Sequence, residues 1–264
     1  MTAVSDHGKR DPERAPPAGA LLAGGLLVAA ALLVTAPLPW PERVYATLLI
    51  GVLPAFVLAA SGPTEVPPGA TRHGIYLTTW VGLWALAALA FAASLGSPDV
   101  PERLGLVPPP ARLVLGWTAV LVAAGALVVL AWRRLGHREA DISRFLMPGT
   151  AGERLHYAWV SLTAGFAEEV VFRGFLVRAV EAASGSILVG VVVAAAVFGV
   201  SHRYQGWAGA ARAGVLGAIL AAPLLVIDSI VPAILAHAAL DLLAGLWWRE
   251  RLWGETIVPP RSSF

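Results

Sequence analysis

The chain has 264 residues, of which 57% are hydrophobic and only 14% charged, and its mean hydropathy is +0.71. A soluble domain carries roughly 25% charged residues, so this composition excludes an ordinary soluble protein and indicates an integral membrane protein. The formal net charge is +2, and the basic residues lie between apolar runs, which excludes nucleic acid as a partner. The absence of cysteine excludes disulfides, thiolate metal sites and a cysteine nucleophile.

Residues 1–17 are polar and lack the pattern of a cleaved signal peptide, so we predict a disordered cytoplasmic tail there. Eight apolar runs follow, most of them near the ~20 residues that a membrane-spanning helix needs. The sequence therefore predicts an all-α polytopic membrane protein with about eight transmembrane helices around an intramembrane polar cavity. The runs lie at about Ala18–Ala36, Val44–Ala60, Tyr76–Leu95, Ala111–Trp132, Arg154–Val180, Ser186–Ser201, Trp207–Ile227 and Ile230–Trp248.

These runs suggest a division of the chain into segments. We predict a scaffold of four membrane helices over residues 18–132, a cytoplasmic loop over 133–153, catalytic helices over 154–248 and a second cytoplasmic tail over 249–264. Basic residues favour the cytoplasm, and they gather in every second connection along the chain. We therefore expect a plasma-membrane protein whose N-terminus and C-terminus are both cytoplasmic.

Charged residues stand out in the fifth run, where Glu168-Glu169-x-x-x-Arg173 lies between strongly apolar segments. A charge in the bilayer core costs about 2.5–3.5 kcal/mol, so ionisable residues at that depth are candidates for a functional site. Residues four apart share one face of a helix, whereas adjacent residues diverge. We therefore predict a structural ion pair between Glu169 and Arg173, with Glu168 left as an unpaired carboxylate.

Further polar residues lie in the later runs. His202 ends the sixth run, and His237 and Asp241 lie four apart in the eighth, whereas Asp228 falls at a turn and is left out of the site. Four costly groups on three helices are best explained if they converge on one water-accessible cavity. Glu168, His202, His237 and Asp241 are therefore the candidate catalytic residues.

Two kinds of hydrolytic chemistry remain open for this set. In one, Glu168 and His202 activate water to attack a carbonyl, and His237 and its neighbour stabilise the oxyanion. In the other, Glu168, His202 and His237 bind a divalent metal such as zinc with an open position. No serine lies in a nucleophile elbow and no HExxH motif occurs, which excludes the usual serine hydrolase and zincin arrangements.

Three motifs in order resemble those of the CPBP family, which comprises CAAX prenyl endopeptidases and bacteriocin-processing intramembrane proteases. They are Glu168-Glu169-x-x-x-Arg173, Phe198-x-x-x-His202 and His237-x-x-x-Asp241, and the likeness covers roughly Glu153 to Leu246. It implies an all-helical fold with a cavity open to the membrane and the cytoplasm. It also implies that Glu168 and His202 activate water while His237 and Asp241 support the transition state. Because family members are described both as metalloproteases and as glutamate-dependent enzymes, the metal stays open.

One position departs from the eukaryotic branch of that family, which has Asn where this chain has Asp241. An ionised Asp accepts hydrogen bonds but cannot donate one to an oxyanion. Three roles are therefore open for Asp241: it is protonated, it orients His237, or it helps to hold a metal. Of these we expect it to orient His237. Many bacterial members are similar to this chain in carrying Asp, so we expect a membrane-associated peptide or protein as substrate rather than a prenylated CAAX protein.

Two functions of other classes remain open. A non-catalytic membrane scaffold or immunity protein with the same fold would bind peptides or a partner, but it has no need of an unpaired buried carboxylate. A proton- or ion-coupled transporter would also use intramembrane Glu and His, and it predicts broken helices in paired halves of the chain. The polar residues here are confined to one half, which favours the enzyme.

Overall fold

The computed structural model describes residues 18–59, 66, 69–137 and 140–247, and these residues form helices and no strand, as the all-α prediction requires. Both predicted tails, 1–17 and 249–264, lie outside the described residues. The helices are α1 (Ala18–Val34), α2 (Trp40–Thr47), η1 (Leu48–Val52), α3 (Leu53–Ala59), α4 (Arg72–Ser94), α5 (Val100–Arg103), α6 (Ala111–Arg134), α7 (Asp141–Phe145), α8 (Ala151–Glu168), η2 (Glu169–Leu176), α9 (Val177–Ser184), α10 (Ile187–Ser201), η3 (Arg203–Gln205), α11 (Gly206–Leu220), α12 (Ala222–Ile227), α13 (Val231–Leu242) and η4 (Leu243–Trp247). Of the η segments, η3 is a 3₁₀-helix and the other three are π-helices.

Four helical stretches in the described part of the chain are long and apolar enough to cross a membrane, as expected of a multi-pass membrane protein. Three shorter apolar helices accompany them, at Leu22–Val34, Ile187–Ser201 and Val231–Trp247. Each predicted run coincides with a helix or with consecutive helices, but the number of about eight crossings stays a prediction. The four long stretches are Trp40–Ala59, Arg72–Ser94, Ala111–Arg134 and Arg203–Ile227.

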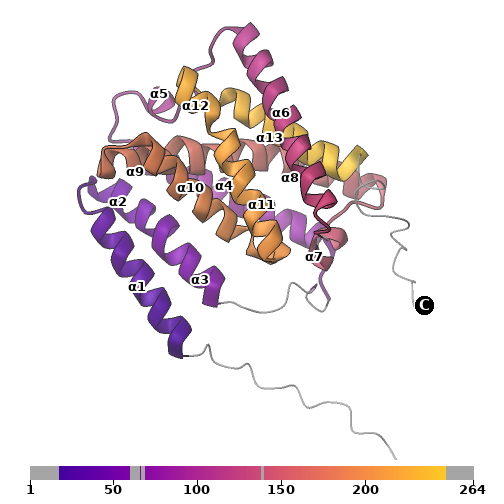
Figure 1. Ribbon diagram of the computed structural model, residues 1–264, viewed down its shortest axis with the longest axis horizontal. Helices are drawn as coiled ribbons and strands as arrows, with labels where there is room; N and C mark the ends of the chain where they lie inside the picture. The colour runs from indigo at the N-terminus through magenta and orange to yellow at the C-terminus, as the bar shows by residue number, and fades with distance from the viewer. Residues whose placement is uncertain (1–17, 60–65, 67–68, 138–139, 248–264) are drawn as a thin grey trace, which may run out of the picture.

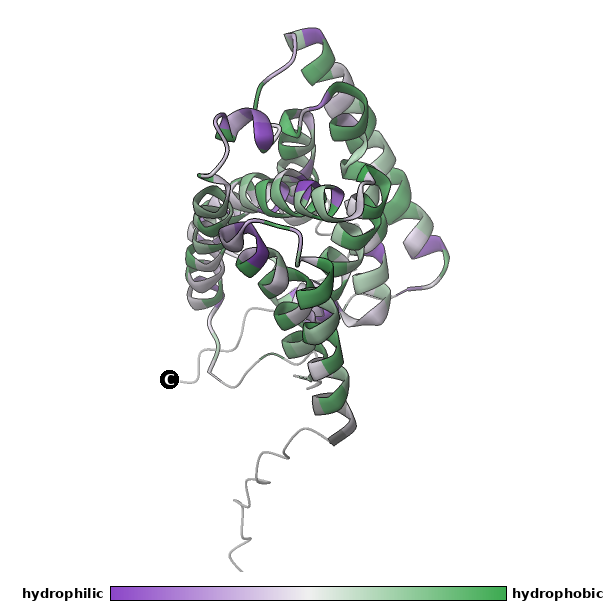
Figure 2. Cartoon of the chain, turned by 90° about the vertical axis from the view of Figure 1, so that its left-hand side faces the viewer, coloured by the Kyte–Doolittle hydropathy of each residue, from purple (hydrophilic) through white to green (hydrophobic). Residues whose placement is uncertain are grey.

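The outward surface of these helices is apolar. Figure 2 shows hydrophobic residues along most of the length of the helices. On α6, for example, Leu115 and Leu127 are each about two-thirds exposed. Soluble proteins rarely expose apolar patches of more than a few hundred Å², so this surface is suited to lipid rather than water.

The polypeptide from α8 through η2 to α9 forms the centre of the fold. All eight residues of η2 are buried, and Val170, Phe175 and Leu176 belong to the largest hydrophobic cluster. Helices α4, α10 and α13 pack around this central segment, and α1, α2 and α3 lie together at one edge of the molecule (Figure 1). The N-terminal helices therefore pack against the segment that carries the candidate site.

Local sequence signals set the ends of these helices. The Thr150 hydroxyl accepts a hydrogen bond from the Glu153 backbone N–H, and the Glu153 carboxylate accepts one from the Thr150 backbone N–H. This capping box satisfies backbone N–H groups that would otherwise lack partners at the start of α8. At the other end of the segment, Gly185 has φ 74° and closes α9 in the left-handed conformation that glycine adopts without strain.

Ion pairs gather at the two ends of the helices. Where α4 begins, Arg72 pairs with Glu153 at the start of α8, with 3.3 Å between Nη1 and Oε1. At the opposite end Arg178 of α9 pairs with Asp228, which adopts φ 52° in the turn between α12 and α13. Asp228 is thus a turn residue outside the site, as its sequence position suggested. These two ion pairs lie near the ends of helices, which fits a membrane protein.

Candidate active site

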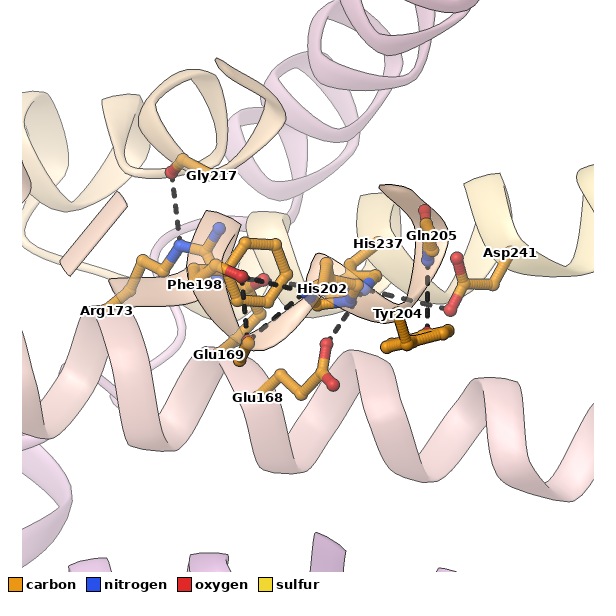
Figure 3. A network of polar contacts seen from close by, with 11 residues as sticks. Glu168, Glu169, Arg173, Phe198, His202, Tyr204, Gln205, Gly217, His237 and Asp241 are labelled. Carbon is orange, nitrogen blue, oxygen red and sulfur yellow. Dashed lines mark hydrogen bonds and ion pairs between the residues drawn. The ribbon is translucent and has the colours of Figure 1, made fainter. Parts of the chain in front are cut away.

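The four predicted catalytic residues line one cavity of about 810 Å³. Glu168 ends α8, His202 follows the last residue of α10, and His237 and Asp241 lie one turn apart on α13. Figure 3 shows these side chains converging from three helices. The structure therefore brings together the groups that the sequence selected, and their chemical roles stay predictions.

A glycine lets α8 and α13 approach closely enough to build this site. A Cβ atom at Gly165 would lie only 2.8 Å from the backbone nitrogen of Ala238 and 2.9 Å from the carbonyl oxygen of Ile234. These are backbone atoms that cannot move aside, so any larger residue would push the two helices apart. Because Gly165 lies one turn before Glu168, this close approach carries both glutamates to His237.

The Glu-Glu segment is not the regular α-helix that the sequence argument assumed. From Glu169 to Leu176 the backbone is a π-helix, in which each hydrogen bond spans five residues rather than four. Such segments are rare, interrupt α-helices and are frequent at functional sites. Nothing in the hydrophobic pattern signals this change.

The Glu169–Arg173 pair lies inside the protein. Arg173 Nη1 is 3.0 Å from Glu169 Oε1, and the side chains are only 2% and 0% exposed. Arg173 Nε donates to the carbonyl oxygen of Gly217, and its guanidinium stacks 4.5 Å over the ring of Phe198. Gly217 has no side chain to obstruct this, since a Cβ there would lie 3.0 Å from Nη2. The chain thus surrounds a buried charge with one carboxylate, one carbonyl and one ring face.

Glu169 has a second partner that the sequence argument missed. Its Oε1 lies 2.7 Å from His237 Nδ1, and because a carboxylate only accepts, Nδ1–H is the donor. The contact joins residues 68 apart in the chain, so helical spacing could not reveal it. We expected Asp241 to orient the imidazole, but its Oδ2 is 3.7 Å from Nε2, beyond hydrogen-bonding distance. The hydrogen bond that orients His237 comes from Glu169 instead.

The other nitrogen of His237 faces the cavity. Glu168 Oε2 lies 3.5 Å from Nε2, on the same edge of the ring as Asp241. The Glu168 side chain is 18% exposed, and that of Asp241 is 40% exposed. Glu168 is therefore a carboxylate that both contacts His237 and opens to the cavity, unlike the fully buried Glu169.

His202 is held by the backbone of its own helix. Its Nδ1 lies 2.8 Å from the carbonyl oxygen of Phe198, which can only accept, so Nδ1 carries a proton. In the neutral ring Nε2 is then the free basic nitrogen. The Phe198 ring packs on His202 at 4.4 Å between centroids and meets the edge of His237 at 6.1 Å. One phenyl ring thus contacts both histidines and Arg173.

Part of the cavity wall comes from the first half of the chain. Leu53 and Phe56 of α3 and Leu83 and Leu86 of α4 line it. The sequence predicts that these helices form a scaffold. The structure makes α3 and α4 part of the wall and gives the site an apolar side.

Contacts join the start of α4 to Leu146 and to the start of α8. The hydroxyl of Tyr76, which lines the cavity, donates to the carbonyl oxygen of Leu146. Burial alone would raise the pKa of Glu153, but hydrogen bonds from the Thr150 and Gly149 backbones and from Arg72 outweigh it and lower that pKa. The ionised carboxylate therefore joins the start of α8 to Arg72 at the start of α4.

The predicted zinc ligands do not fit a metal site. In the parts of the chain that the structure describes, no three His, Asp or Glu side chains are grouped so that they could hold a metal ion. His237 binds Glu169 through Nδ1, so only Nε2 of its ring faces the cavity. The arrangement is one of carboxylates hydrogen-bonded or ion-paired to histidine and arginine.

One comparison with known proteins gives a match. Residues 150–243 match the family model described as Type II CAAX prenyl endopeptidase Rce1-like. No curated protein and no solved structure matches the chain. The matched segment runs from the capping box of α8 to the end of α13, and it contains the Glu-Glu segment and both cavity histidines.

Proposed function

Residues 150–243 are a domain of the Rce1-like type II CAAX prenyl endopeptidase family, as the three sequence motifs predicted, and from this premise we propose that the protein is an intramembrane endopeptidase. Membership of that family implies a protease that acts on a protein or peptide. The observation that carries the proposal is that Glu168, His202 and His237 line one cavity, which also has apolar lining from α3 and α4.

In the proposed reaction Glu168 is the general base. It accepts a proton from a water molecule in the cavity, and the hydroxide attacks the carbonyl carbon of the scissile peptide bond. His202 assists through its free Nε2, because its Nδ1–H is committed to the Phe198 carbonyl. The C–N bond then breaks, the proton passes to the leaving amine, and a carboxylic acid and an amine are released.

His237 is the proposed support for the negative charge that develops on the carbonyl oxygen. Its Nδ1–H stays on Glu169, so as an imidazolium it can donate from Nε2 into the cavity. Glu168, Glu169 and Asp241 all lie within 3.7 Å of its ring nitrogens and balance that positive charge. Glu169 is thus a positioning residue for His237 and not itself a group that meets the substrate.

The proposed substrate is a membrane-associated peptide or protein. The cavity has a charged side formed by the second half of the chain and an apolar wall from α3 and α4. Such a wall stabilises hydrophobic side chains of a substrate, and a hydrophobic segment would reach it from the lipid bilayer. The prenylated substrate in the family name is not required by these contacts.

Three alanine variants test the proposal. Glu168→Ala, His202→Ala and His237→Ala should each abolish cleavage while the protein still inserts into the membrane. Glu181→Ala is a matched control, because Glu181 pairs with Arg178 outside the cavity and should leave cleavage unchanged. Cleavage retained in all three cavity variants would refute the proposal and favour a scaffold with the same fold.

A further inference from the structure

Three tyrosines line the cavity, and their hydroxyl groups are used differently. The Tyr76 hydroxyl donates to the carbonyl oxygen of Leu146, and that of Tyr157 donates to the carbonyl oxygen of Asp241. The Tyr204 hydroxyl instead accepts a hydrogen bond, at 3.1 Å, from the side-chain nitrogen of Gln205. Two of the three therefore commit their protons to the backbone.

The direction of the Tyr204 bond is fixed by Arg212. Arg212 Nη2 lies 3.0 Å from Gln205 Oε1, and a guanidinium only donates, so the amide oxygen must face it. The amide nitrogen of Gln205 then faces Tyr204 and donates to its oxygen. The hydroxyl proton of Tyr204 is not needed for this contact and can be given to another acceptor.

The position of this hydroxyl is suited to the reacting group. The Tyr204 ring lies beside His202, at 5.8 Å between centroids, and the residue is 45% exposed and lines the cavity. Glu168 and Asp241 line the same cavity as Tyr204. Figure 3 shows Tyr204 and Gln205 next to the two catalytic histidines. No hydrogen bond within the described residues uses the Tyr204 proton.

From this arrangement we infer that Tyr204 is a further catalytic residue, whose hydroxyl donates a hydrogen bond to the substrate carbonyl and to the oxyanion that forms from it. This inference rests on the proposed function. The Tyr204 hydroxyl supplies a hydrogen-bond donor, which an ionised Asp241 cannot do because a carboxylate only accepts. No bond to Tyr204 forms or breaks, and its proton stays on the hydroxyl throughout.

The first test is Tyr204→Phe, which removes the hydroxyl and keeps the ring beside His202. Loss of one oxyanion donor lowers kcat by about 100-fold or more, and we expect such a fall with little change in KM. The probe is a quenched fluorescent peptide carrying the cleavage site found by comparing protein N-termini. Tyr45→Phe is the control, because Tyr45 loses a hydroxyl that donates to the Leu86 carbonyl and does not line the cavity.

A second variant changes the direction of the bond instead of removing it. Gln205→Glu keeps the size of the side chain and can still accept from Arg212, but its carboxylate cannot donate to Tyr204. The hydroxyl would then donate to this carboxylate, and kcat should fall as in Tyr204→Phe. Combined with Tyr204→Phe, Gln205→Glu should lower kcat no further, because both changes remove the same donor.

The outcomes separate this inference from the proposed function. If Glu168→Ala abolishes peptide cleavage while Tyr204→Phe and Gln205→Glu keep the wild-type kcat, Tyr204 is not an oxyanion donor and the protease assignment stands. If Tyr204→Phe changes KM alone, Tyr204 contacts the substrate without supporting the transition state, which also overturns the inference. If the wild type yields no Glu168-dependent cleavage, the proposed function itself fails.

Discussion

The carboxylate of Glu169 lies 2.7 Å from Nδ1 of His237 and, through the same oxygen, 3.0 Å from Nη1 of Arg173. One buried oxygen thus links the π-helical segment to α13 and balances the guanidinium. The sequence suggested a division in which Glu169 is structural and Glu168 is chemical. The geometry shows that Glu169 also holds the imidazole against which Glu168 lies.

This relationship predicts an asymmetry between two substitutions. Glu169→Gln leaves the buried Arg173 guanidinium without its carboxylate partner, and removing one partner of a buried ion pair costs about 3–5 kcal/mol. Arg173→Met leaves Glu169 with His237 as a partner and should destabilise less. Thermal unfolding in detergent measures both. An equal loss in the two variants would contradict the bridging role of Glu169.

The close approach of α8 and α13 predicts that Gly165→Ala impairs the enzyme. The added Cβ meets backbone atoms of Ala238 and Ile234 below 3.0 Å, and overpacking of this kind costs about 1–3 kcal/mol. We also expect reduced cleavage, because the glutamates move away from His237. Gly152→Ala is the control on the same helix, since a Cβ there has open space. Equal behaviour of the two variants would show that the contact does not position the site.

The capping box at the start of α8 predicts a dependence of stability on pH. The pKa of Glu153 in the folded protein is lowered from its ordinary value of 4.5. The ionised carboxylate therefore stabilises the fold fully above pH 4.5, and this stabilisation is lost as the pH falls through the lower pKa of the folded state. Unfolding temperatures of the wild type and Glu153→Gln should therefore differ at neutral pH and converge in strong acid. If the difference in unfolding temperature between the two proteins does not change with pH, the charge of Glu153 does not contribute to stability.

The predicted orientation in the membrane can be tested by cysteine labelling, because the chain contains no cysteine. Eight crossings with a cytoplasmic N-terminus put Ser97 outside the cell and Ser262 inside. A membrane-impermeant maleimide should label Ser97→Cys in intact cells and Ser262→Cys only after the membrane is opened. Labelling of both from outside, or of neither, would contradict the predicted number or direction of crossings.

Much of the helical framework could be predicted because most of the apolar runs are close to the length of a membrane helix. The grouping of Glu168, His202, His237 and Asp241 could also be anticipated, since charges inside apolar runs are costly and tend to share a cavity. These inferences depend on single residues set against an apolar background. They do not require knowledge of how distant helices meet.

The remaining features depend on contacts between distant helices. An apolar residue such as Phe56 carries no sign of whether it faces lipid or a cavity, so the wall from α3 and α4 could not be assigned. The π-helix at Glu169 leaves no trace in the hydrophobic pattern. Tyr204 follows a motif histidine by two residues, but an aromatic residue at a helix end is also what a membrane interface favours. Only the contacts of Gln205 and Arg212 distinguish the two possibilities.

The most direct test of the central claim is a comparison of protein N-termini in native membranes that contain either the wild type or Glu168→Ala, at equal levels of inserted protein. The account predicts that a set of new N-termini is present with the wild type and absent with Glu168→Ala, and these termini would identify the substrates. Identical N-termini in the two membranes would contradict the protease assignment and would leave the cavity a binding or structural role.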